Sequence, residues 1–168
     1  MHPPRILIAG LGNIFLGDDG FGCAAVQRLG QLPIAKAARV VDFGVRAREL
    51  AYALTECDAA ILVDATARGE PPGTLYVLEP SQQVGEAALV DGHSLTAEQV
   101  LFTLSAQARP RFVRIVGCEP LTLEPDADDM GLSSVVRAAV EAAVPLIERL
   151  VAELLVELTA PAGAVIHA

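Results

Sequence analysis

Long apolar runs are missing from this chain of 168 residues, and their absence limits what it can be. The longest stretches without a charge are Ile6–Gly17 and Leu158–Ala168, both shorter than the ~18 apolar residues that a membrane-spanning helix needs. Charged residues are also few, at 20% against 52% hydrophobic residues, which excludes an intrinsically disordered chain. We therefore expect a single globular domain over residues 1–168.

Positive charge is scarce as well. The chain has 12 Lys and Arg residues against 21 Asp and Glu residues, a formal net charge of −9. Free nucleic acid is bound by basic surfaces, so this class of partner is excluded. An acidic protein is suited instead to binding cations, or a partner with a basic segment.

No two cysteines lie close together in the sequence. Cys23, Cys57 and Cys118 are widely separated, a pattern that favours neither a closed zinc site nor a redox pair. The first residues, Met1–Arg5, lack the cationic region and the long apolar stretch of a secretory signal. We therefore expect a cytoplasmic protein whose thiols are buried and reduced.

What the sequence does contain is an alternation of strand and helix patterns. Apolar, β-branched runs predict strands at Arg5–Gly10, Arg39–Phe43, Ala59–Ala65, Gly73–Leu78 and Arg111–Gly117. Segments of helical period are Asp19–Leu29, Ala47–Leu54, Thr96–Ala106 and Ser133–Leu158. This order predicts a three-layer α/β fold, with a mostly parallel five-stranded sheet and helices on both of its faces.

The turn after the first predicted strand is rich in glycine and carries two acids. It runs from Gly10 to Gly22, and it departs from the dinucleotide-binding pattern because Phe15 stands where that pattern needs a glycine. Asp18 and Asp19 occupy the start of the following helix, where a pyrophosphate would otherwise bind. We expect Asp18 to cap this helix and Asp19 to face a cation.

Two further polar residues are expected at the same edge of the sheet. Asp64 ends the third predicted strand, and His93 stands just before the next helix. Ligands of open α/β sheets bind outside the carboxyl ends of the strands, so Asp19, Asp64 and His93 are expected to converge there. Two carboxylates and one imidazole suit nickel, zinc or iron and leave coordination positions open.

Several motifs, taken together and in this order, resemble those of the nickel-iron hydrogenase maturation endopeptidases. Besides Asp64 and His93, they are Gly10-x-Gly12-Asn13, Asp18-Asp19-Gly20-x-Gly22, Asp42-Phe43-Gly44, Gly117-Cys118-Glu119-Pro120 and Met130-Gly131-Leu132-Ser133. The resemblance extends from about Arg5 to Leu158, which is nearly the whole chain.

The resemblance implies a protease that removes a short C-terminal extension from the precursor of the hydrogenase large subunit after nickel insertion. The nickel in the substrate would act as the recognition signal, so nickel arrives with the partner, the nickel-loaded precursor. Asp19, Asp64 and His93 match the positions that contact this nickel. We expect a monomer, since an enzyme that docks a large partner gains nothing obvious from self-association.

A nucleophile motif is not found in the sequence. No serine or cysteine stands in a nucleophile elbow, and no His-Glu-x-x-His pattern is present. A protease of this kind must therefore activate water, either through a metal acting as a Lewis acid or through a carboxylate acting as a general base. Asp19 and Asp64 are the catalytic candidates for either route.

One position departs from the pattern of this family. After the second strand the family usually has Asp-x-Gly-x-x-Gly, whereas this chain has Ala47 at the last place. If that glycine needs a positive φ, we expect strain at Ala47 and an effect on substrate preference.

Two other functions compete with the protease. A nickel-binding metallochaperone or checkpoint protein without proteolytic activity would use the same three ligands, although the chain lacks the histidine-rich tracts common in nickel carriers. A nucleotide-binding module is disfavoured by Phe15 and by the acid pair.

Overall fold

The computed structural model describes residues 2–80, 96–124 and 131–161 of the chain. Its strands are β1 (Ile6–Leu11), β2 (Arg39–Gly44), β3 (Ala59–Ala65), β4 (Leu75–Leu78) and β5 (Phe112–Cys118). Its α-helices are α1 (Phe21–Leu29), α2 (Ala47–Thr55), α3 (Ala97–Phe102) and α4 (Ser134–Thr159). Two short 3-10 helices are η1 (Gly17–Gly20) and η2 (Pro33–Lys36).

The strands form one five-stranded sheet in the order β2-β1-β3-β5-β4. All neighbours are parallel except β4, which pairs antiparallel with β5 at one edge. This arrangement confirms the predicted mostly parallel sheet. Parallel pairing also sets the register at the functional end, where Gly10 lies opposite Val63 and Asp64 opposite Gly117.

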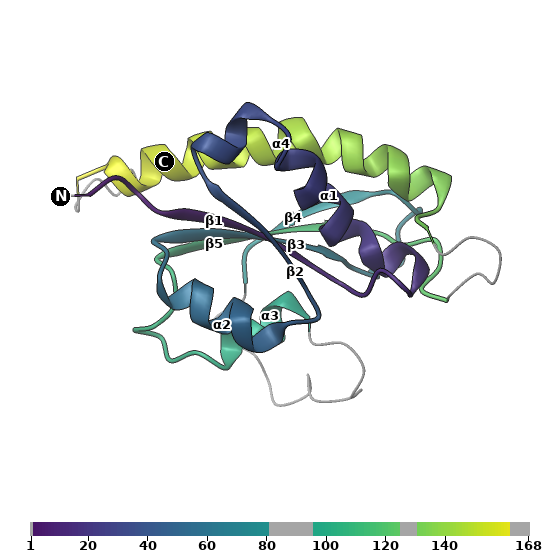
Figure 1. Ribbon diagram of the computed structural model, residues 1–168, viewed down its shortest axis with the longest axis horizontal. Helices are drawn as coiled ribbons and strands as arrows, with labels where there is room; N and C mark the ends of the chain where they lie inside the picture. Colours follow the sequence, from purple (N-terminus) through teal and green to yellow (C-terminus); the bar gives the residue numbers. More distant parts are fainter. Residues whose placement is uncertain (1, 81–95, 125–130, 162–168) are drawn as a thin grey trace.

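Helices cover both faces of the sheet, as predicted. Figure 1 shows α1 and α4 on one face and α2 and α3 on the other. Side chains of the central strands alternate between the two layers: Ile8 and Ile61 pack with α1 and α4, whereas Leu7 and Leu62 pack with α2 and α3. Burial on both faces explains why these strands read as continuous apolar runs.

Helix α1 approaches the sheet unusually closely because glycine stands at the crossing. A Cβ atom at Gly22 would overlap the carbonyl oxygens of Val63 and Leu11. One at Gly10 would overlap the carbonyl oxygen of Gly22. The start of α1 is therefore fixed directly against the ends of β1 and β3.

The helix starts agree with the prediction where the capping residue and its partner are a few positions apart in the sequence. Thr96 forms the predicted capping box with Gln99, and the Ser133 hydroxyl accepts a hydrogen bond from Val136 N at the start of α4. The helix predicted from Asp19 instead begins at Phe21, after η1. Within the described ranges, no helix has the length and apolar character required to span a bilayer.

Candidate active site

The carboxyl ends of β1, β3 and β5 lie at one edge of the sheet, and two acids are placed there. Asp19 is carried by η1, which follows β1, and Asp64 is the penultimate residue of β3. The Asp64 side chain is buried, with 8% of the residue exposed, and it accepts hydrogen bonds from the backbone N–H groups of Ala65 and Ala97. Asp64 therefore packs against the first turn of α3.

The charge of Asp19 acts on Asp64. Burial, followed by the nearby Asp19 carboxylate, raises the pKa of Asp64 to about 7, although the two backbone hydrogen bonds oppose this shift. A carboxyl group with such a pKa exchanges its proton near neutral pH, which suits a general acid or base. Two acids from separate elements therefore lie near enough at this edge for the charge of one to affect the other.

The glycine-rich turn after β1 wraps around Asp19 and leaves no cradle for a phosphate. Asn13 N donates a 2.7 Å hydrogen bond to Asp19 Oδ2. Gly12 has a φ of 129°, and a Cβ atom there would overlap the carbonyl oxygen of Asp19. The backbone N–H that could contact an anion is thus already bonded to a carboxylate.

Asp18 does not cap a helix, so the sequence-based expectation for it was wrong. Its side chain is fully buried and accepts four hydrogen bonds from distant segments. The donors are Leu121 N at 2.9 Å, Thr122 N at 3.2 Å, Ser133 N at 2.7 Å and the Ser133 hydroxyl at 2.9 Å. Asp18 joins η1 to the segment after β5 and to the start of α4.

A cavity of about 230 Å³ opens beside Asp64. Its polar lining residues are Asp64, Thr66, Arg68, Thr96 and Glu98. The walls come from the segment that follows β3 and from the start of α3, so the cavity is reached from the same edge as the two acids. It offers room for part of a substrate next to the Asp64 carboxyl group.

His93 lies outside the described residues, and its predicted role stays a prediction. Thr96, three residues further along the sequence, lines the Asp64 cavity. Among residues 2–80, 96–124 and 131–161, no three His, Cys, Asp or Glu side chains are arranged to hold a metal ion. Asp19 and Asp64 lie at the predicted edge, and their role as metal ligands stays a prediction.

A third buried carboxylate, Glu119, holds the segment after β3 that forms part of the cavity wall, and it was not singled out as a functional residue from the sequence. It accepts hydrogen bonds from Arg68 N at 2.8 Å, Gly69 N at 3.1 Å and the Tyr76 hydroxyl at 2.6 Å. The Tyr76 hydroxyl, together with these backbone donors, lowers the pKa of Glu119. The sequence signals at Glu119 are its place directly after β5, at the same edge, and its membership of the Gly117–Pro120 motif.

The three thiols are unsuited to nucleophilic attack. Cys23, Cys57 and Cys118 are all free, and burial raises the pKa of each to about 12. For Cys23, the charges of Asp42, Asp64 and Asp19 act in the same direction. At neutral pH these thiols stay protonated, and a protonated thiol is a weak nucleophile.

Ala47 carries no backbone strain, contrary to the expectation from the family pattern. It is the first residue of α2, and no residue other than glycine in the described ranges has a positive φ. The preceding turn is held by Asp42, whose carboxylate accepts hydrogen bonds from Gly44 N at 3.0 Å and Gln27 Nε2 at 3.1 Å. The turn therefore forms without a glycine at position 47.

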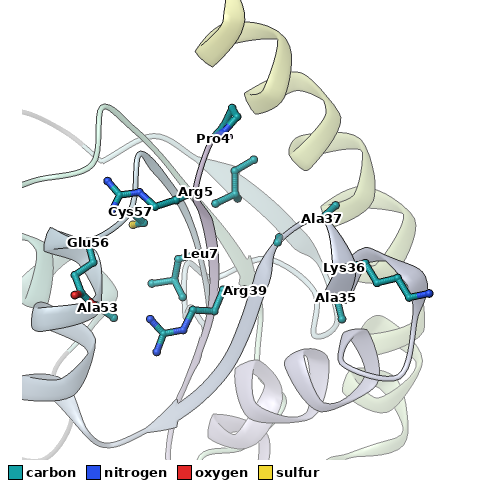
Figure 2. A pocket seen from close by; sticks show the side chains of 12 residues that line it. Pro4, Arg5, Leu7, Ala35, Lys36, Ala37, Arg39, Ala53, Glu56 and Cys57 are labelled. Atoms are coloured by element: carbon teal, nitrogen blue, oxygen red, sulfur yellow. The ribbon is translucent and has the colours of Figure 1, made fainter. Parts of the chain in front are cut away.

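A larger hollow of about 520 Å³ lies at the opposite, amino edge of the sheet (Figure 2). It is lined by the starts of β1 and β2 and the end of α2, away from Asp19 and Asp64. Figure 2 shows Lys36 pointing away from Arg5 and Arg39, so the cations do not converge on one point. We therefore do not include this hollow in the candidate site.

Comparison with known proteins gives one consistent family. The model of the HycI hydrogenase maturation protease family matches residues 23–150. The chain is 31% identical to the hydrogenase expression/formation protein HupD of Rhizobium leguminosarum bv. viciae, over 97% of this chain and 82% of that protein.

Solved structures agree with this family. The hydrogenase maturating endopeptidase HybD from E. coli superimposes with a TM-score of 0.70 at 28% identity, covering 89% of this chain and 93% of that one. A hydrogenase 2 maturation peptidase from a Thaumarchaeota archaeon gives a TM-score of 0.66 at 32% identity, with 88% and 98% covered.

Proposed function

Because the chain belongs to the hydrogenase maturation protease family, we propose that it removes the C-terminal extension of a nickel-iron hydrogenase large-subunit precursor after nickel insertion. The observation that supports this role is the presence of two electrostatically coupled acids, Asp19 and Asp64, at the carboxyl edge of the sheet, with a cavity beside Asp64. A divalent cation placed between them would relieve their mutual repulsion. Nickel held by the precursor supplies such a cation as part of the substrate.

In this proposal Asp19, Asp64 and His93 contact the nickel of the docked precursor. One imidazole and two carboxylates suit nickel and leave coordination positions for the ligands that the precursor itself provides. Recognition through the metal makes the filled precursor the substrate and leaves the empty one uncut. It also explains why two carboxylates stand after the first strand, where a nucleotide-binding turn would hold a pyrophosphate.

Water is the proposed nucleophile, since the buried thiols are protonated and no serine nucleophile motif is present. Asp64 acts as the general base: it takes a proton from the attacking water, whose oxygen bonds to the peptide carbonyl carbon. The proton then passes to the departing amine as the C–N bond breaks. An aspartic-type peptidase is thus the proposed mechanistic class. We place its action in the cytoplasm, as a monomer.

The test uses purified precursor in two forms, nickel-loaded and metal-free. Incubation with the protein is expected to lower the mass of the nickel-loaded form by that of its C-terminal extension and to leave the metal-free form intact, as read by mass spectrometry. His93→Ala and Asp19→Asn are expected to abolish the mass change. Binding of the nickel-loaded form without any mass loss would instead favour the metallochaperone.

A further inference from the structure

Large apolar side chains are exposed on two short segments beside the candidate active site. Ile14 and Phe15, before η1, are 53% and 58% exposed, and Leu121 and Leu123, after β5, are 59% and 44% exposed. We refer to these four residues as the apolar rim. Tyr52 on α2 and Val156 on α4 are exposed apolar residues on separate elements, outside the apolar rim.

The two segments of the apolar rim are held together by η1. Asp18 N donates to Thr122 O at 3.0 Å, and the Asp18 carboxylate accepts from Leu121 N and Thr122 N. On the other side, Leu16 N and Asp19 N donate to Asn13 O and Leu16 O respectively, each at 3.1 Å. The exposure of the rim is therefore a property of a fixed surface.

A fixed exposed surface of this kind has a cost. The isolated protein forgoes the stabilisation that burial of these side chains in the core would give. Contiguous apolar surface that is kept out of the core is typical of a protein-binding site.

The apolar rim is continuous with the candidate active site. Phe15 N donates a 3.0 Å hydrogen bond to Asn13 Oδ1, and Asn13 N donates to Asp19 Oδ2 at 2.7 Å. One residue, Asn13, thus links the rim to the carboxylate proposed to meet the nickel. A polypeptide that brings its metal to Asp19 must lie next to Phe15.

We propose that the apolar rim docks an apolar surface of the hydrogenase precursor, adjacent to its nickel, and so determines the affinity for the substrate protein. This inference rests on the proposed function. A second copy of the chain is the poorer occupant, because each copy carries a net charge of −9 and because it would block access to Asp19. The rim provides contact area that does not depend on the metal.

The experiment compares two double variants of equal charge. Phe15→Ser with Leu121→Ser removes half of the rim, and Tyr52→Ser with Val156→Ser is the matched control on other exposed positions. Binding is measured by calorimetry with the metal-free precursor, which is bound but not cut, and processing is measured with the nickel-loaded form. Circular dichroism checks that both variants are folded. If the rim variant is not folded, Ile14→Ser with Leu123→Ser replaces it.

The rim variant is expected to bind the metal-free precursor at least 10-fold more weakly than the control and to raise KM by a similar factor. Its processing rate at saturating precursor is expected to stay within about twofold of wild type, since the chemistry is untouched. If the rim variant shows unchanged binding and unchanged KM while the wild type processes the precursor, the docking role of the rim is overturned and the proposed function stands. If the rim variant binds the precursor more weakly but the wild type does not process it, the proposed function is overturned and the docking role of the rim stands. A wild-type dimer that dissociates in the rim variant would assign the surface to self-association and overturn the proposal.

Discussion

Two neighbouring acids in one sequence motif do different work, and their surroundings explain the difference. Asp18 is fully buried with four donors on its carboxylate, so its charge is matched by hydrogen bonds. Asp19 is partly exposed, accepts a hydrogen bond from Asn13 N, and lies near enough to Asp64 to raise the pKa of that carboxyl group. The first acid stabilises the loops, and the second is available to a ligand.

Asp18→Asn is expected to destabilise the protein by about 1–3 kcal/mol, because the amide nitrogen would face N–H and O–H donors and leave at least one of them unpaired. Chemical denaturation measures the change. Glu141→Gln is the control: Glu141 is exposed and pairs with Arg28, so the expected effect is below about 1 kcal/mol. Equal stability of Asp18→Asn and wild type would contradict the role assigned to Asp18.

Asp64→Asn is expected to abolish processing of the nickel-loaded precursor, since the amide can neither accept the proton of water nor balance a cation. At pH 8 its thermal midpoint is expected to match or exceed that of wild type, because a poorly solvated charge has been removed. Scanning calorimetry and the mass of the processed product provide the two readings. A wild-type processing rate in this variant would exclude Asp64 from the mechanism.

At the scale of elements, helix α4 covers one face of the sheet and carries a proline in its interior. Pro145 is exposed and lacks the N–H that the helix ladder needs, so it weakens the helix locally. Pro145→Ala is expected to raise stability by about 1–3 kcal/mol, as measured by denaturation. Glu148→Ala, also exposed on α4, is the control with an expected change below about 0.5 kcal/mol. A loss of stability in Pro145→Ala would mean that neighbouring elements are packed around the proline.

The elements were predictable where the signal was local. The strands β1 and β3, the Thr96 capping box and the Ser133 cap follow from apolar patterns and from residues a few positions apart. The roles of Asp18 and Glu119 were not predictable, because their partners lie up to 115 residues away. The sequence alone does not distinguish an aspartate that caps a helix from one that accepts hydrogen bonds from distant segments.

The candidate site was predictable in part for the same reason. Asp64 ends a buried parallel strand, so the sheet topology alone assigns it to the ligand-binding edge. The unstrained backbone of Ala47 was not predictable, because it depends on the residue at which α2 begins. Strand ends are set by patterning, whereas loop shapes are set by contacts that form only in the folded chain.

At the scale of the whole molecule, Asp64 links proton binding to stability. Its pKa is about 7 in the folded protein and ~3.9 in an unfolded chain, so between these values the folded state binds more protons. The free energy of unfolding is therefore expected to fall as pH rises from about 4 to 7. The lowered pKa of Glu119 acts in the opposite sense, and its contribution is lost only as the pH falls below about 4.5.

Denaturation of the metal-free protein at pH 5 and pH 8 measures this linkage, with Asp64→Asn as the reference. Asp64→Asn keeps the repulsion among the other acidic side chains, which also grows with pH, but it has no carboxyl group at position 64 to titrate. Wild type is expected to lose more stability than Asp64→Asn between the two pH values. Parallel losses in both proteins would show that Asp64 titrates normally.

The close contact of α1 with the sheet at Gly22 has a consequence for how such a protein changes over time. A Cβ atom at Gly22 would overlap the carbonyl oxygens of Leu11 and Val63, so the approach of α1 to the strand that carries Asp64 is a contact between main chains. This contact does not depend on the residue types of the exposed loops. Surface loops can therefore diverge to fit a new partner while the distance between the two acids is inherited unchanged, which separates the evolution of recognition from that of chemistry.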